Sequence, residues 1–227
     1  MDFPKACLFD LDGVLLDTEG LHKKAWFKTA DTFGTKLSEE QLMQLQGRRR
    51  VDCAKKILEW IKITTSVKHL LEVHQPISKK LMARVREIDG ASHLIRWCYE
   101  NDLPTALVTS SSKSSVAYKC GSNNWQKLIK TRVYGDDLAL RKGKPEPDPY
   151  LLAAKKLGIN PKLCWAIEDS ESGANAASKA GCIVRLLNNE DKIVLNENNI
   201  KGLSNIYRIK YLHQFQTKLE EAKNRTS

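Results

Sequence analysis

Short apolar segments alternate with amphipathic ones along most of the chain. Runs of the length and character of buried strands lie at 5–11, 104–109, 131–134, 163–168 and 182–187. Between them, apolar residues recur at helical spacing at 91–101, 113–120, 148–157 and 172–180. Strand–helix alternation of this kind predicts an α/β fold with a parallel sheet.

One segment departs from this alternation. Between Asp17 and Ile88 no run is typical of a strand, and Leu, Lys, Glu and Gln recur at helical spacing. We therefore expect a helical insertion after the first strand. Long insertions at the end of a strand usually carry function.

The composition narrows the class of protein. Of the 227 residues, 41% are hydrophobic and 28% are charged, which is ordinary for a soluble globular protein. No apolar run approaches the ~18 residues of a membrane helix, and an N-terminus with Asp2 is not typical of a signal peptide. The six cysteines form no C-x-x-C pair, which favours reduced thiols in a cytoplasmic protein.

The charge is strongly basic, at +10 with a pI near 9.3. Such a balance indicates either nucleic acid or a small anionic substrate as the partner. The basic residues are dispersed apart from Arg48–Arg50 and the cluster at 141–144, which favours the small substrate. The basic stretch 208–227 is either an amphipathic terminal helix or a solvated tail.

Two aspartates end the first apolar run, in Phe9-Asp10-Leu11-Asp12-Gly13-Val14. Side chains two apart in extended backbone point the same way, so both carboxylates would face the carboxyl edge of the sheet, where ligands bind. Two like charges this close persist only if a cation or a shared proton separates them. A hard cation such as Mg²⁺ fits. Taken alone, the two aspartates could also be turn or helix-capping residues.

Later strand ends carry polar groups suited to phosphate or metal. Thr109 is followed by the serines 110–112, whose hydroxyl and N–H groups would seat a phosphate or cap the next helix. Lys144 lies in a loop with three prolines, which would hold it as a fixed cation unless it is simply solvated. Glu168 and Asp169 add the carboxylates that a magnesium site needs.

This order of motifs resembles the haloacid dehalogenase superfamily, and its sugar phosphatase and beta-phosphoglucomutase-like branch in particular. The segments that carry the resemblance are 9–19, 144–150, 168–173 and 176–181. It extends over roughly residues 5–205. It implies an α/β Rossmann-like parallel-sheet core at 1–16 and 89–227, with an inserted α-helical cap domain at 17–88.

The resemblance also implies roles for the motif residues. Asp10 corresponds to the nucleophile that forms an aspartyl-phosphate, and Asp12 to the general acid/base that protonates the leaving oxygen and then activates water. The ligands implied for Mg²⁺ are Asp10, the backbone carbonyl of Asp12, Asp169 and, in support, Glu168. The groups implied for the phosphoryl oxygens are those of Thr109, Ser110 and Lys144.

Three cap residues are similar to substrate-contacting positions of this branch. His22 resembles a residue of the first cap helix, and Gly47 and Arg50 resemble the substrate-specificity loop. One arginine there could reach a second anionic group of the substrate. An ordinary helix-surface histidine and a solvated face for Arg48–Arg50 stay open as alternatives.

Two departures bear on the choice of reaction. Glu19 after Asp17-Thr18 is commoner in the phosphatases of this branch than in its mutases. The pair Lys79-Lys80 does not align securely with the mutases' cap lysine.

We therefore expect a cytoplasmic, magnesium-dependent phosphatase of a small phosphorylated metabolite, with a sugar phosphate as the substrate. Neither the individual substrate nor the oligomeric state follows from the sequence. The first alternative is a beta-phosphoglucomutase-type mutase. The alternative from another class is an idle, nucleic-acid-binding or regulatory protein, which the intact motifs disfavour.

Overall fold

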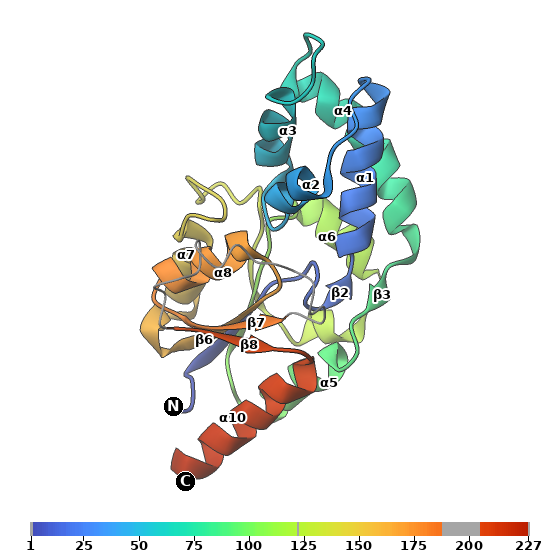
Figure 1. The fold of residues 1–227 in the computed structure, drawn as a ribbon. Coiled ribbons are helices and arrows are strands. Elements are labelled where there is room, and N and C mark those ends of the chain that lie inside the picture. The colour runs from blue at the N-terminus through green and yellow to red at the C-terminus, as the bar shows by residue number, and fades with distance from the viewer. Residues whose placement is uncertain (1, 122, 188–204, 227) are drawn as a thin grey trace.

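The centre of the computed structural model, which describes residues 2–121, 123–187 and 205–226, is a six-stranded parallel sheet. Its strand order is β5-β4-β1-β6-β7-β8 (Figure 1). The strands are β1 (Ala6–Phe9), β4 (Thr105–Val108), β5 (Thr131–Val133), β6 (Cys164–Glu168), β7 (Ile183–Leu187) and β8 (Ile206–Ile209). All five predicted strands are present, which confirms the α/β fold.

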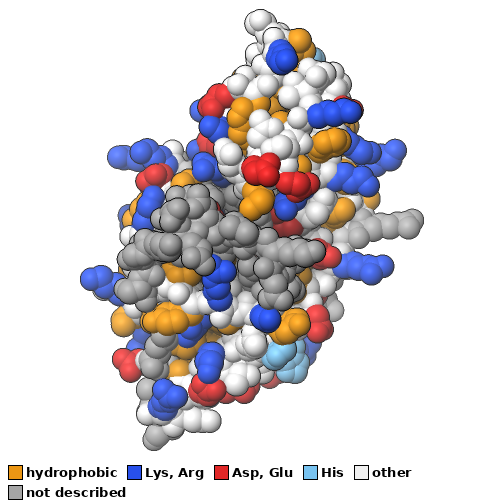
Figure 2. Space-filling view, viewed as in Figure 1, with side chains coloured by type: hydrophobic (Ala, Val, Ile, Leu, Met, Phe, Trp, Pro, Cys, Tyr) orange, Lys and Arg blue, Asp and Glu red, His pale blue; other side chains and the backbone are white. Residues whose placement is uncertain are grey.

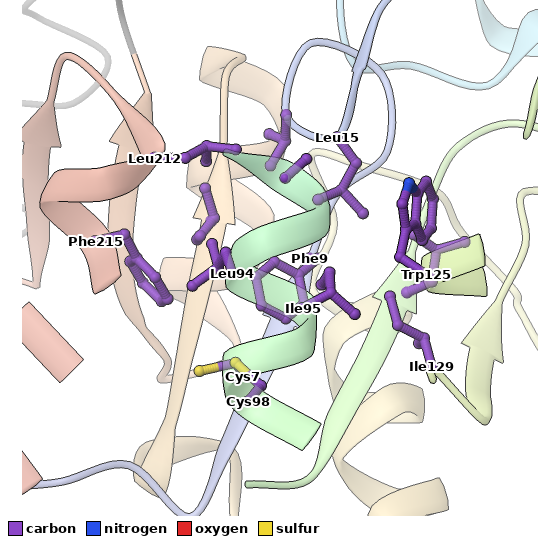
Figure 3. Close-up of a cluster of buried hydrophobic side chains, with 14 of the residues drawn as sticks. Cys7, Phe9, Leu15, Leu94, Ile95, Cys98, Trp125, Ile129, Leu212 and Phe215 are labelled. Atoms are coloured by element: carbon purple, nitrogen blue, oxygen red, sulfur yellow. The ribbon is translucent and has the colours of Figure 1, made fainter. Parts of the chain in front are cut away.

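Helices cover both faces of this sheet, because successive side chains of a strand point to opposite faces. Cys7 and Phe9 of β1 point into a cluster with α5 and α10, where Figure 3 shows Phe9 beside Leu94 and Ile95. Leu8 points the other way, towards α7 and α8. The helices of the core are α5 (Ala91–Glu100), α6 (Lys113–Cys120), α7 (Asp148–Leu157), α8 (Glu171–Lys179) and α10 (Leu212–Thr226).

The inserted segment forms four α-helices at one end of the molecule, which we call the cap helices (Figure 1). They have a hydrophobic cluster of their own, centred on Trp26, Leu42, Ile57 and Leu70. Their bounds are α1 (Glu19–Thr32), α2 (Glu39–Leu45), α3 (Arg50–Leu58) and α4 (Val67–Leu81). A helical insertion with its own core is what the spacing of apolar residues predicts; the exact domain bounds of 17 and 88 stay a prediction.

The expectation that 17–88 contains no strand is wrong at its two ends. β2 (Leu16–Asp17) and β3 (Arg86–Glu87) pair as an antiparallel ribbon where the chain leaves the core and returns to it. Two chain crossings that run side by side satisfy each other's backbone groups. Two residues per strand are too few to leave a pattern in the sequence.

The C-terminal part holds a second difference. β8 was not expected, because only Ile209 of its four residues is buried and the strand lies at the edge of the sheet. Of the two alternatives for 208–227, the helix is correct from Leu212 onwards. The stretch 188–204, inside the predicted core, lies outside the described residues.

Candidate active site at the carboxyl edge of the sheet

The strand order brings the predicted motifs to one edge of the sheet. β1 lies between β4 and β6, so the residues that follow these three strands are neighbours. The Asp10 N–H donates to the carbonyl of Ile167, 3.1 Å away, and so anchors the nucleophile candidate beside Glu168. Thr109 follows β4 on the other side of Asp10 and is almost fully buried.

Lys144 lies in the loop before α7, and its side chain extends to Asp10 and Glu168 at the same edge of the sheet. Its buried Nζ donates to Asp10 Oδ1 at 2.7 Å, to the Val108 carbonyl at 3.0 Å and to Glu168. Burial lowers the pKa of this ammonium, but the charges of Asp10 and Glu168 outweigh burial and raise it. The Tyr150 hydroxyl also donates to Glu168. Lys144 is therefore a buried, paired cation, and its partners in this structure are two carboxylates and one backbone carbonyl.

Asp12 has a separate set of partners. Its Oδ1 accepts from Thr18 Oγ1 at 2.7 Å and from the ammonium of Lys119, and it lies 3.1 Å from His22 Nε2. Its Oδ2 accepts from Ser111 Oγ at 2.8 Å. Burial raises the pKa of this carboxyl, but Lys119 and His22 outweigh burial and hold the pKa well below its usual value.

The two aspartates that follow the first strand each contact a different lysine. Asp10 is paired with Lys144 and Asp12 with Lys119. The expectation that a metal ion separates the two aspartates stays a prediction. Two lysines supply the two positive charges, from segments far away in the sequence.

A group of three carboxylates can hold a metal ion. One oxygen from each of Asp10, Glu168 and Asp169 lies within 4.8 Å of the other two. Burial and the charges of Glu19 and Asp10 raise the pKa of Asp169 well above its ordinary value. Burial, opposed in part by Lys144, raises the pKa of Asp10 to about 7. Crowded acids of this kind, two of them buried and Asp169 partly buried, fit a hard divalent cation, which would relieve their repulsion.

Gly13 shows how closely the backbone after Asp12 approaches this group. Its φ is +84°, and a Cβ there would lie 1.8 Å from Asp169 Oδ2. Only glycine fits such a position. The chain that follows Asp12 therefore lies directly against the third carboxylate.

The cap helices contact this edge through the segment that joins α2 to α3. Ser110 Oγ donates to the Gly47 carbonyl at 2.7 Å, and Gln46 Nε2 donates to Asp169 Oδ2 at 3.1 Å. Arg50 begins α3, and its Nη2 donates to Ser115 Oγ of α6 at 2.7 Å. The predicted specificity loop therefore lies over the predicted metal and phosphate residues.

A cavity that is partly open to solvent lies between the cap helices and the core. Thr109 and Lys144 are each only 2% exposed, and they lie behind it rather than in its wall. The predicted site residues that line it are Asp10, Asp12, His22, Gly47, Arg50 and Ser110.

Sequence reasoning missed Lys119, Gln46 and the role of Glu19. Lys119 is one lysine on a predicted helix, and nothing in its neighbourhood distinguishes it from a surface lysine. Glu19 lines the cavity, where burial and the charge of Asp12 raise its pKa to about 8. Its position directly after Asp17-Thr18 was the available signal.

The fold and the site together define an α/β protein with carboxylates and two buried lysines gathered at the carboxyl edge of its sheet. The sequence model of a family described as haloacid dehalogenase-like hydrolase matches residues 7–187. The chain therefore belongs to this family of hydrolases, which confirms the predicted superfamily.

Relatives with curated names cover the same region of the chain. A phosphorylated carbohydrates phosphatase from Thermotoga maritima is 28% identical over 78% of this chain and 82% of its own length. A probable pseudouridine-5'-phosphatase from Drosophila melanogaster is 32% identical over 77% of this chain and 78% of its own. A bifunctional riboflavin kinase/FMN phosphatase from Arabidopsis thaliana is 30% identical over 77% of this chain. The matched part corresponds to 46% of the length of that protein.

Solved structures share the whole architecture. A crystal structure of beta-phosphoglucomutase from Clostridium difficile has a TM-score of 0.77 at 23% identity and covers 96% of this chain and 98% of its own. At this identity the likeness concerns the fold. It confirms the Rossmann-like core with its inserted helices.

In the part of the chain that the structure describes, no helix combines the length and the apolar character needed to cross a membrane. The six cysteines at 7, 53, 98, 120, 164 and 182 are all buried and free, as their scattered spacing predicts.

Proposed function

We propose that this chain is a magnesium-dependent phosphatase of a small phosphate monoester, a sugar phosphate or a similar metabolite, acting through an aspartyl-phosphate on Asp10. One observation carries the proposal. The Asp10 carboxylate opens into the cavity while Lys144 anchors it from behind, beside the acidic group of Glu168 and Asp169.

The proposed reaction has two steps. A carboxylate oxygen of Asp10 attacks phosphorus, the bond from phosphorus to the leaving oxygen breaks, and Asp12 gives that oxygen a proton. Water then attacks phosphorus, the bond to Asp10 breaks, and Asp12 takes the proton from water. Thr109, Ser110 and Lys144 would hold the phosphoryl oxygens at the edge of the sheet.

Magnesium would be held by Asp10, the Asp12 carbonyl and Asp169, with Glu168 in support, and would neutralise charge on the phosphoryl group. The crowding of these acids supports this assignment.

The names of the relatives support a phosphorylated metabolite as the substrate. Those proteins are named for phosphorylated carbohydrates, for pseudouridine 5'-phosphate and for FMN, so the shared element is a phosphate monoester on a polar carbon skeleton. Nucleic acid is disfavoured, since Figure 2 shows Lys and Arg side chains scattered over this face with Asp and Glu between them.

A screen of phosphorylated metabolites for release of inorganic phosphate tests the proposal. We expect activity with Mg²⁺, loss of activity with a chelator and recovery when Mg²⁺ is restored. Calcium should inhibit, because its larger and looser coordination sphere spoils the in-line geometry. Asp10→Asn should be inactive, whereas Asp31→Asn, at an exposed carboxylate of α1, should match the wild type.

Full activity in chelator would remove the metal from the mechanism. A mutase would instead require a bisphosphate activator and release little phosphate. Salt-dependent binding to DNA in a protein without phosphatase activity would favour the nucleic-acid alternative.

A further inference from the structure

We propose that Lys119, together with Ser111, is a positioning residue that holds the Asp12 carboxylate from the core side, so that Asp12 keeps its orientation when the cap helices move away. The inference rests on the proposed function and deepens it. It makes hydrolysis of the phosphoenzyme independent of cap closure.

The four partners of Asp12 come from two parts of the molecule. Thr18 is the residue before α1 and His22 lies within α1, so both belong to the start of the cap helices. Ser111 follows β4, and Lys119 lies on α6, in the core. Lys119 Nζ also donates to Ser111 Oγ at 2.8 Å, which leaves the Ser111 hydroxyl to donate to Asp12. Lys119 and Ser111, the core-side pair, thus donate to both oxygens of the Asp12 carboxylate.

If Lys119 only filled space, its burial would destabilise the fold relative to an apolar residue. Its side chain is 0% exposed, and a buried ammonium costs free energy unless it is paired. An apolar side chain would fill the same space next to Val116 and Cys120 without that cost. The described contacts of its ammonium are Asp12 and Ser111, so the compensating interactions all converge on Asp12.

The cap is joined to the core near the site by a few hydrogen bonds. Besides the contacts of Thr18 and His22 with Asp12, they include those from Ser110 to Gly47, from Gln46 to Asp169 and from Arg50 to Ser115. The cavity lies between the two parts, so opening of these contacts would widen the entrance for a substrate. Opening takes His22 away from Asp12, while Ser111 and Lys119 stay with the core.

The consequence concerns the second chemical step. There, water attacks phosphorus, the bond from phosphorus to the Asp10 carboxylate breaks, and the proton of water passes to Asp12. If Lys119 and Ser111 keep the Asp12 carboxylate oriented towards the attacking water, Asp12 can accept the proton while the cap is open. Water has free access to the site in that state. Return of the phosphoryl group to an organic hydroxyl needs water to be excluded. The core-side pair therefore favours hydrolysis over mutase chemistry.

Single-turnover kinetics with 4-nitrophenyl phosphate and Mg²⁺ test this. The phenolate leaves without much protonation, so formation of the phosphoenzyme needs Asp12 little. We expect Lys119→Met to leave the burst of nitrophenolate within about threefold of the wild type and to slow breakdown of the phosphoenzyme about 10- to 100-fold. Lys113→Met, at an exposed lysine on the same helix, should leave both steps unchanged.

A double variant shows whether Lys119 acts through Asp12. Adding Lys119→Met to Asp12→Asn should change phosphoenzyme breakdown by less than about threefold, because the group that Lys119 positions is already absent. Ser111→Ala should slow the same step to a smaller degree, and it provides the test if Lys119→Met does not fold.

Three outcomes would overturn the inference. They are breakdown at the wild-type rate in both Lys119→Met and Ser111→Ala, an equal loss in both chemical steps, and additive losses in the double variant. Equal loss in both steps would mean that Lys119 contacts the phosphoryl group itself. A wild-type protein that forms no phosphoenzyme with any phosphate monoester would instead contradict the proposed function.

Discussion

Asp10 and Asp12 are two residues apart, yet their carboxylates have opposite electrostatic surroundings. Asp10 lies among acids, and burial raises its pKa to about 7. Asp12 lies among donors, and Lys119 and His22 lower its pKa in spite of burial. Pairs of titratable groups with diverging pKa values often carry different catalytic roles. The two similar residues therefore differ in their surroundings, and substitution is needed to separate their roles.

The first prediction separates these roles by substitution. Asp12→Asn keeps the nucleophile, so an aryl phosphate should still phosphorylate the protein. A sugar alkoxide needs a proton donor, so turnover of a sugar phosphate should fall ~100- to 10,000-fold. Rapid-quench trapping should show label on Asp10 and its accumulation in Asp12→Asn. Label on Asp12, or loss of the aryl-phosphate burst in both Asp10→Asn and Asp12→Asn, would make the assignment wrong.

The second prediction concerns Lys144 and stability. Lys144→Met leaves Asp10 and Glu168 buried without their common cation, and removal of one partner from a buried ion pair costs about 3–5 kcal/mol. We expect the free energy of unfolding from urea titrations at pH 7 without metal to fall by about that amount. Lys142→Met, at an exposed lysine, should change it little. A fall below about 1 kcal/mol for Lys144→Met would contradict this account.

At the scale of elements, α4 carries a buried titratable group. His74 stacks on Trp26 of α1 with ring centroids 3.6 Å apart, and its Nδ1 lies 3.1 Å from Thr29 Oγ1. Burial, with smaller contributions from the charges of Arg50 and His22, lowers the pKa of His74 to about 3. The packing of α4 on α1 thus requires the neutral imidazole.

The third prediction follows from this packing. Below its ordinary pKa of about 6.5, His74 binds a proton in the unfolded chain but stays neutral in the folded one down to about pH 3. The stabilisation that the neutral His74 contributes is therefore fully present above pH 6.5. It is lost as the pH falls from 6.5 towards 3, by at most ~1.4 kcal/mol per pH unit.

Urea titrations at pH 7, 6 and 5 check this slope. The His74→Gln variant should lose less stability between pH 7 and 5 than the wild type, by about 1–2 kcal/mol. His93→Gln, at an exposed histidine of α5, should keep the wild-type slope. Identical slopes in wild type and His74→Gln would show that His74 does not resist protonation in the folded protein.

At the scale of the whole molecule, the site is shared between two parts of the chain. The core supplies the carboxylates and lysines, and the segment joining α2 to α3 closes the cavity over them. Arg50 spans the two parts through Ser115 and lines the cavity. Substrate selection is therefore expected from the cap side and chemistry from the core side.

The fourth prediction uses this division. Arg50→Ala should raise KM for the natural substrate by about 10-fold or more, because a charged distal group loses its hydrogen-bonding partner. KM for an aryl phosphate, which has no such group, should change less than about threefold. Steady-state kinetics with both substrates measure the difference, with Arg141→Ala at an exposed arginine as the control. Equal changes for both substrates would make Arg50 a surface charge.

The sequence alone determined the parallel sheet, the helical insertion and the placement of Asp10, Glu168 and Asp169 at one edge. These follow from local periodicity and from the rule that parallel strands end on the same side. Three prolines that stiffen its loop also indicated Lys144 as a fixed cation, with a solvated lysine as the alternative.

Only the tertiary structure decided which of the polar groups contact one another. Lys119 pairs with Asp12 across 107 residues, and Gln46 reaches Asp169 across 123. Lys119 has the same local pattern as a surface lysine, because its burial depends on how α6 packs below the cavity. The sequence therefore determined the types of group at the site, and packing determined that Asp10 and Asp12 each have a lysine of their own.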